Sequence, residues 1–329
     1  MNDHYYYGVG RVRSLEARLL TPPQLSRMES AADFQSAFAV LSETPYAENL
    51  PGLKEPFDFE ELCGLELLSL KNLLDHLAPE NEILKALFKK YDYLNAKILL
   101  RMLFSRTEKA ESHSKIGTLD FDKLKLYIFE GIKEIDEKEI LNAIDLARIS
   151  FEQNKDPQLL DQILDKHYFT YLKQVCSASP SLLIKEMVDF QIDLINIKTL
   201  LRSRNRIKNK KRVEILLLDP GLLDKDILLG LLDKNLPEII SRLGFTPYLP
   251  AIAHGIERFE SDPELLEKLM DDFIIERFRK AKYLSCGIEP LAGFYLAKAA
   301  EIRTLRFILV CKKNYVAPER IRERIGVSY

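Results

Sequence analysis

The stretch YDYLNAKILLRMLF, residues Tyr91–Phe104, decides how this chain is organised. The stretch FQIDLINIKTLLRS, residues Phe190–Ser203, repeats its pattern D-x-x-N-x-K-x-L-L-R at a shift of 101 residues. Twice that shift separates the two copies of Thr-Pro-Tyr, at residues 44–46 and 246–248. Self-similarity at a fixed period indicates a repeated structural unit.

A third and weaker copy of the pattern, AEIRTLRFIL, begins at Ala300. In this copy Glu301 takes the place of the Asn and Arg303 takes the place of the Lys. The repeat therefore predicts three diverged units of about 100 residues each. We place the units at residues 1–106, 107–207 and 208–329.

The composition is that of a folded chain without a strong charge bias. Of its 329 residues, 47% are hydrophobic and 30% are charged, and the formal net charge is −2. This balance argues against disorder and gives no overall electrostatic preference for nucleic acid or lipid. The four cysteines form no C-x-x-C pair, which predicts reduced, mostly buried thiols in a cytosolic protein. No apolar run approaches the roughly 18 residues of a membrane-spanning helix.

The sequence predicts an all-α fold. Apolar residues recur at steps of three and four, as in LEKLMDDFIIERF at residues 266–278. Only 13 glycines and no alternating Val/Thr runs leave little room for a sheet. Thr-Pro pairs mark helix breaks, because proline disfavours the α conformation of the residue before it. We interpret each Thr-Pro-Tyr as a joint, with Tyr46 and Tyr248 packing the turn onto its unit.

The repeated helix is apolar round most of its circumference, which is typical of a helix buried between neighbours. Its polar residues then need partners, because an unpaired buried charge is costly. The same carboxylate, amide and cations at the same places in two units predict a repeated polar lock with a structural role. The expected members are Asp92, Asn95, Lys97, Arg101, Asp193, Asn196, Lys198 and Arg202.

Several motifs in a fixed order carry a resemblance to a known family. Besides the two copies of the D-x-x-N pattern, they are Y-x-x-x-R-V-R at residues 7–13, L-S-E-T-P-Y at 41–46 and E-I-R-x-L-R at 301–306. With this order and spacing the chain resembles, over essentially its full length, the C subunit of the A-type and V-type ATPases, a relative of the d subunit of the eukaryotic V-ATPase. Gly8 and Gly10 depart from the family, which tends to carry helix formers there.

The resemblance implies a fold of three similar helical units in a funnel-shaped, pseudo-threefold arrangement. It implies a non-catalytic rotor subunit of the central stalk, which links membrane rotor-ring subunits to central-shaft subunits and couples ATP turnover to proton or sodium transport. Such a chain is expected in the cytoplasm, held peripherally at the membrane through the complex. Neither a cofactor nor a small-molecule substrate is expected.

No catalytic motif competes with this interpretation. Tyr7–Ser14 contains G-x-G, but Arg13 stands where a dinucleotide loop has its third glycine, and no strand pattern precedes it. The sequence has no G-K-S/T P-loop and no G-x-S-x-G nucleophile turn. The five histidines are scattered, with no H-x-x-x-H spacing, which favours surface or hydrogen-bonded histidines over metal ligands.

A basic segment, RSRNRIKNKKR at Arg202–Arg212, favours a different class of protein. Its seven cations in eleven residues support an alternative hypothesis, a helical-repeat scaffold with a nucleic-acid-binding loop. No aromatic residue interleaves the cations, as a stacking platform would require. We therefore expect no nucleic-acid partner and assign the segment a contact with lipid head groups or an acidic partner. The residues proposed for that contact are Arg204, Arg206, Lys208, Lys210, Lys211 and Arg212.

Overall fold

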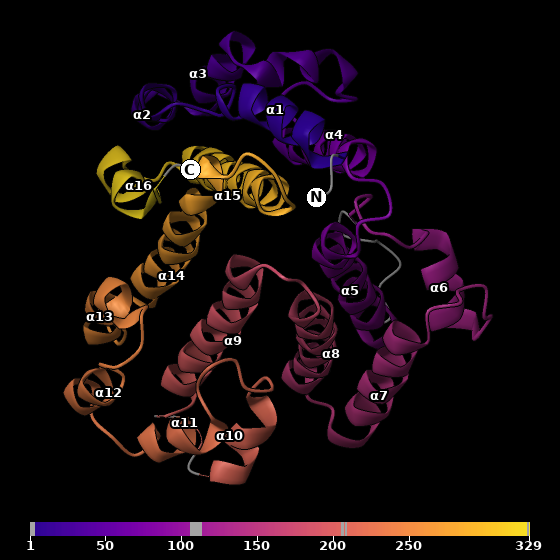
Figure 1. The fold of residues 1–329 in the computed structure, drawn as a ribbon, viewed down its shortest axis with the longest axis vertical. Helices are drawn as coiled ribbons and strands as arrows, with labels where there is room; N and C mark the ends of the chain where they lie inside the picture. The colour runs from indigo at the N-terminus through magenta and orange to yellow at the C-terminus, as the bar shows by residue number, and fades with distance from the viewer. Residues whose placement is uncertain (1–3, 106–113, 205–206, 208, 328) are drawn as a thin grey trace. The chain divides into compact units, whose positions relative to one another are not determined.

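The structure is a computed structural model, and it describes residues 4–105, 114–204, 207, 209–327 and 329 (Figure 1). These residues form α-helices and 3-10 helices without any β-strand, which confirms the all-α prediction. The chain divides into two compact units, residues 80–235 and residues 1–79 with 236–329. The funnel-shaped arrangement and the three repeat boundaries stay predictions.

The unit of residues 80–235 is a bundle of long helices flanked by short ones. Its helices are α5 (Glu82–Ser105), α6 (Phe121–Glu130), α7 (Lys138–Asn154), α8 (Pro157–Ser177), α9 (Leu182–Ser203), α10 (Lys210–Leu216) and α11 (Lys225–Leu231). Helix α8 lies between α9 on one side and α5 with α7 on the other, and packs against all three (Figure 1). Both copies of the repeated pattern, on α5 and α9, belong to this unit.

The other unit is built from both ends of the chain around the longest helix. Its N-terminal elements are α1 (His4–Glu16), α2 (Pro22–Ser30), α3 (Phe34–Ala39), the 3-10 helices η1 (Val40–Glu43), η2 (Pro45–Glu48) and η3 (Leu50–Gly52), and α4 (Phe59–Leu77). Its later elements are α12 (Leu236–Arg242), α13 (Leu249–Glu257), α14 (Pro263–Phe278), η4 (Arg279–Tyr283), α15 (Glu289–Lys313) and α16 (Pro318–Arg324). Helix α15 packs against α1, α2, α3, α4 and α14, so it forms the centre of this unit.

Helix α1 includes both glycines that depart from the family pattern, Gly8 and Gly10. A Cβ at Gly8 would lie 3.5 Å from the carbonyl oxygen of Leu77, an ordinary contact, and a Cβ at Gly10 would meet nothing within 4 Å. The two glycines therefore neither break the helix nor serve a close approach. Among the described residues no helix is long and apolar enough to span a membrane.

The two Thr-Pro-Tyr turns share their local geometry. Each threonine hydroxyl donates to the carbonyl oxygen three residues before it, at 2.7 Å for Thr44 and 2.8 Å for Thr246. The rings of Tyr46 and Tyr248 are fully buried, with exposed fractions of 0%. This geometry matches the interpretation of the tripeptide as a joint, because the proline ends one helix and the tyrosine fixes the turn in the core.

Candidate functional site

The polar residues of α5 bind a segment of backbone that leads into α6. Asn95 exchanges two hydrogen bonds with Ser114: its Oδ1 accepts the Ser114 N–H at 2.9 Å, and its Nδ2 donates to the Ser114 carbonyl at 2.8 Å. Asp92 accepts the N–H and the hydroxyl of Thr118 at 3.1 Å and 2.6 Å, and the N–H of Leu119 at 3.0 Å. Both side chains are buried, and their hydrogen bonds are made to half-buried or exposed residues of the segment.

The polar residues of α9 bind the segment that leads into α11 in the same way. The Oδ1 atom of Asn196 accepts the N–H of Leu218 at 2.8 Å, and its Nδ2 donates to the Leu218 carbonyl at 3.3 Å. Asp193 accepts the N–H groups of Leu222 and Leu223 at 3.0 Å and 3.1 Å. We call the two arrangements the α5 lock (Asp92, Asn95) and the α9 lock (Asp193, Asn196).

Both locked segments need a glycine at the point of closest approach. A Cβ at Gly117 would lie 2.0 Å from Oδ1 of Asp92, which no side chain tolerates. A Cβ at Gly221 would lie 2.3 Å from the carbonyl oxygen of Asp189 and 2.6 Å from Oδ1 of Asp193. The glycines therefore let the backbone come within hydrogen-bond distance of the carboxylates.

The sequence contains a signal for these segments that the helix repeat does not reveal. The stretch IGTLDFD at residues 116–122 corresponds to PGLLDKD at residues 220–226, and both carry G-x-L-D-x-D. The shift here is 104 residues, three more than between the helices, because the connection after α9 is longer. At the single shift of 101 residues the two stretches do not align.

Burial and hydrogen bonding act in opposite directions on Asp92. Burial raises the pKa of this carboxyl group, while the hydrogen bonds from Thr118 and Leu119 favour the charged form; the net pKa is above its ordinary value. The hydroxyl of Thr118 and the backbone N–H groups thus offset part of the cost of burying the carboxylate of Asp92.

Two cations of the predicted lock, Lys97 and Arg101, bind helix α8 and not the segment before α6. On α5, Lys97 forms an ion pair with Asp165 of α8, at 2.6 Å, and Arg101 pairs with Asp161 of the same helix. Lys97 is half-buried and Arg101 is exposed, so the structure does not bring either cation to the carboxylate and amide of the lock. On α9, Lys198 is half-buried and Arg202 is exposed.

Part of the basic segment is occupied by contacts within the chain. Arg204 donates to the carbonyl oxygen of Lys234 at 3.1 Å, and Lys210 pairs with Asp233 at 3.0 Å. Arg212 pairs with an acidic residue at 3.2 Å, the N-cap Asp156 of α8. Lys210, Lys211 and Arg212 are exposed, whereas Arg206 and Lys208 lie outside the described residues.

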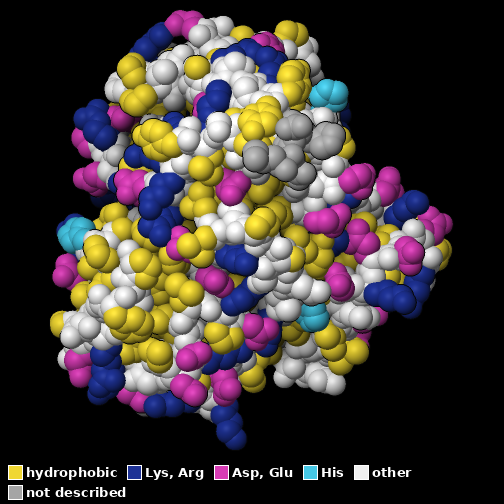
Figure 2. Space-filling model, in the orientation of Figure 1, with side chains coloured by type: hydrophobic (Ala, Val, Ile, Leu, Met, Phe, Trp, Pro, Cys, Tyr) yellow, Lys and Arg dark blue, Asp and Glu magenta, His cyan; other side chains and the backbone are white. Residues whose placement is uncertain are grey.

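The surface shows no field of one charge sign on the face drawn in Figure 2. Lysines and arginines are interspersed there with aspartates and glutamates, in keeping with the net charge of −2. The part of the chain that the structure describes contains no group of three His, Cys, Asp or Glu side chains arranged to hold a metal ion. Cys63, Cys176 and Cys311 are buried free thiols, as predicted, and burial raises the pKa of Cys63 and of Cys176 to about 12.

The recurring buried polar residues of α5 and α9 thus bind the chain's own backbone. Comparison with known proteins identifies the class of protein. The chain is 24% identical to the C subunit of the A-type ATP synthase of Methanocaldococcus jannaschii, over 97% of this chain and 85% of that protein. It is 25% identical to the C subunit of the A-type ATP synthase of Desulfurococcus, over 98% and 90%. It is 24% identical to the C subunit of the V-type sodium ATPase of Enterococcus hirae, over 97% of both chains.

A family profile settles the membership. The ATP synthase (C/AC39) subunit family matches residues 8–324, nearly the whole chain, and the chain belongs to this family. It is thus a subunit of a rotary ATP synthase or ATPase, part of a multi-subunit complex and not its catalytic subunit.

Proposed function

We propose that this chain is the rotor subunit of the central stalk in an A/V-type ATPase. In that role it links the membrane rotor ring to the central shaft and couples ATP turnover to proton or sodium transport. The observation that carries the proposal is the family match over residues 8–324, together with relatives named as C subunits that align over nearly their full length. Alignment over 85–97% of the length of such proteins supports the same place in the complex.

The locks supply a physical basis for transmitting torque. A coupling subunit needs no reactive group, but its helices must not slide over one another under load. The α5 lock and the α9 lock each tie a long helix to a backbone segment through four or more hydrogen bonds from buried side chains. Directional bonds of this kind resist sliding better than apolar packing, which is non-directional.

The partners and the location follow from the same role. We assign rotor-ring and central-shaft subunits as the partners, and the cytoplasmic side of the membrane as the place, with the chain held there through the complex. Three helical units at residues 1–106, 107–207 and 208–329, in a funnel-shaped pseudo-threefold arrangement, would suit a ring-shaped partner. No cofactor and no small-molecule substrate enter this proposal.

The basic segment is assigned a contact with an acidic partner or lipid head groups. Neutralising Lys210, Lys211 and Arg212 together should leave the fold intact, because exposed charges contribute within about 0.5 kcal/mol each. The same variant should assemble less well with the complex, and most visibly at raised salt, where the remaining attraction is screened. Unchanged assembly at every salt concentration would remove the segment's part in the contact.

Co-purification tests the proposed function. The tagged chain is expressed in the organism that encodes it. Membranes are solubilised in mild detergent, and captured proteins are identified by mass spectrometry. The proposal expects rotor-ring, shaft and catalytic subunits of one ATPase in the eluate. Capture of RNA released by salt, without any ATPase subunit, would overturn it and favour the nucleic-acid scaffold.

A further inference from the structure

Helix α15 carries the third copy of the repeated pattern with different chemistry. Glu301 stands in the place of Asn95 and Asn196, and Lys298, three residues earlier, stands in the place of Asp92 and Asp193. A Glu and a Lys thus replace the amide and the carboxylate that bind backbone groups in the first two copies.

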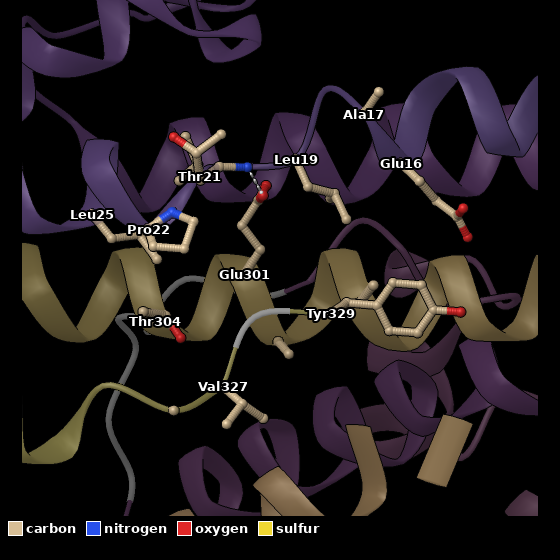
Figure 3. Close-up of a pocket in the computed structure, with 14 residues that line it drawn as sticks. Glu16, Ala17, Leu19, Thr21, Pro22, Leu25, Glu301, Thr304, Val327 and Tyr329 are labelled. Carbon is tan, nitrogen blue, oxygen red and sulfur yellow. Dashed lines mark hydrogen bonds between the residues drawn. The ribbon is translucent and has the colours of Figure 1, made fainter. Parts of the chain in front are cut away.

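Glu301 binds the backbone just before α2. Its carboxylate accepts the N–H of Leu20, as Figure 3 shows, and the hydroxyl of Tyr46 at 2.8 Å. Leu20 is buried, so its N–H has no free access to water. The bond therefore satisfies a backbone N–H, as the bond from the N–H of Ser114 to Oδ1 of Asn95 does.

Lys298 supplies the charge that a buried carboxylate requires. Its Nζ lies 2.8 Å from Glu301 and 2.9 Å from Glu66, and 4.1 Å from the centre of the Tyr46 ring. Burial alone would lower the pKa of Lys298, but the two carboxylates outweigh burial and raise it. The cluster of Glu66, Lys298 and Glu301 is thus a charged, buried network with its positive group in the middle.

The length of the bound segment explains the change of residue types. In the first two locks the N-cap of the next helix, Asp120 or Asp224, stands six residues after the residue that the asparagine binds. The intervening N–H groups need the aspartate. Before α2 the N-cap is Thr21, directly after Leu20, and a capping box with Gln24 satisfies the next donors. No aspartate is needed there, and a lysine takes its place.

We infer that the last long helix closes the series on the start of the chain: Glu301 of α15 clamps the segment that leads into α2, as Asn95 clamps the segment before α6 and Asn196 the segment before α11. Each of the three long helices with the pattern then holds the segment just before a short helix. For α5 and α9 that segment follows the long helix in the chain, and for α15 it lies in the N-terminal part of the chain. This inference rests on local geometry and stands independently of the proposed function.

A cavity lies beside the clamp, so side-chain packing on the segment is incomplete at this point. It has a volume of about 280 Å³, and Leu20, Thr21, Ala297, Ala300, Glu301 and Thr304 are among its lining residues (Figure 3). The two alanines leave α15 without bulk where a large apolar side chain would otherwise press on the N-terminal segment. The hydrogen bond from Leu20 to Glu301 therefore adds a directional attachment at this point.

Hydrogen exchange of the full-length chain tests the clamp. In Glu301→Ala the amide of Leu20 should exchange about ten-fold faster or more, because it loses the carboxylate that accepts its hydrogen bond. The peptides that contain Ser114 and Leu218 should be unchanged, since their locks lie in other segments. The matched control is Arg303→Met on the same helix, which removes only a surface pair with Asp271 at 3.3 Å and should leave Leu20 protected.

A milder variant keeps the test decisive if Glu301→Ala does not yield folded protein. Glu301→Gln keeps the size of the side chain and one acceptor oxygen. Its other oxygen becomes an NH2 group, which cannot accept a hydrogen bond from Leu20, Tyr46 or Lys298. It should accelerate exchange at Leu20 by a smaller factor, again without change at Ser114 or Leu218. Exchange at Leu20 that equals the wild type in either folded variant would overturn the inference.

Discussion

The lock on α9 and the cluster on α15 hold backbone by different means, and the difference follows from what they hold. The α9 lock binds a segment of several residues before α11 with a neutral amide and one carboxylate that accepts N–H groups. The α15 cluster binds one residue before α2 with a carboxylate that a lysine neutralises. The position of a buried polar group is thus repeated, while its residue type adapts to the local number of unpaired donors.

A second contrast lies within one compact unit. The segment held by the α9 lock has further attachments to α8, where Lys173 donates to the carbonyl of Pro220 at 2.6 Å and Thr170 donates to Asp219 at 3.2 Å. Leu218 and Leu223 in this segment are buried and Leu222 is exposed, whereas the segment held by the α5 lock has no fully buried residue among those it binds: Ser114 and Leu119 are half-buried and Thr118 is exposed. The α9 lock therefore works in a drier environment, where an unsatisfied donor costs more.

The largest stability effect should come from the charge in the α15 cluster. Lys298→Met leaves the carboxylates of Glu66 and Glu301 buried together without a cation, which should cost about 3–5 kcal/mol. Urea unfolding followed by circular dichroism measures it. The matched control, Arg303→Met, removes an exposed pair and should cost less than about 1 kcal/mol. Equal losses in the two variants would mean that the cluster is hydrated rather than charged and buried.

The next effect compares the two aspartates. Asp193→Ala leaves the N–H groups of Leu222 and Leu223 without their acceptor and should cost on the order of 3 kcal/mol. Asp92→Ala should cost less, by about 1 kcal/mol, because Thr118 is exposed and Leu119 half-buried, whereas the Leu223 that Asp193 binds is buried. Thermal or urea unfolding of both variants decides the order. A larger loss of unfolding free energy for Asp92→Ala than for Asp193→Ala would contradict the conclusion that the α9 lock is the less hydrated of the two.

The glycines provide a steric test of both locks at once. Gly117→Ala and Gly221→Ala should each destabilise the fold by about 1–3 kcal/mol, because the new methyl group collides with lock oxygens. Gly230→Ala in α11 is the control, since a Cβ there meets nothing within 4 Å. It should stabilise the fold by about 0.5–1 kcal/mol through helix propensity. Neutral behaviour at Gly117 or Gly221 would show that the segment is not held against its aspartate.

Much of this architecture was predictable from the chain alone, and the exceptions have physical causes. The helical period, the two copies of D-x-x-N and the joint at Thr-Pro-Tyr follow from local patterns, and the family resemblance is confirmed. The targets of Asp92 and Asn95 did not follow from the helix repeat, because the G-x-L-D-x-D segments align only at a shift of 104 residues, and a backbone N–H by itself has no sequence signature. The hydrogen bond between Leu20 and Glu301 was harder still to predict from the sequence, since the two residues lie near opposite ends of the chain.

The most direct test of the coupling role is to measure ATP hydrolysis and ion uptake together in vesicles that carry the assembled complex. In complexes prepared without this chain, hydrolysis by the soluble part should persist while ion uptake is lost, and adding the purified chain back should restore uptake. The isolated chain itself should hydrolyse no ATP. Ion uptake that continues at the wild-type ratio to hydrolysis without the chain would contradict the proposal that it couples the two.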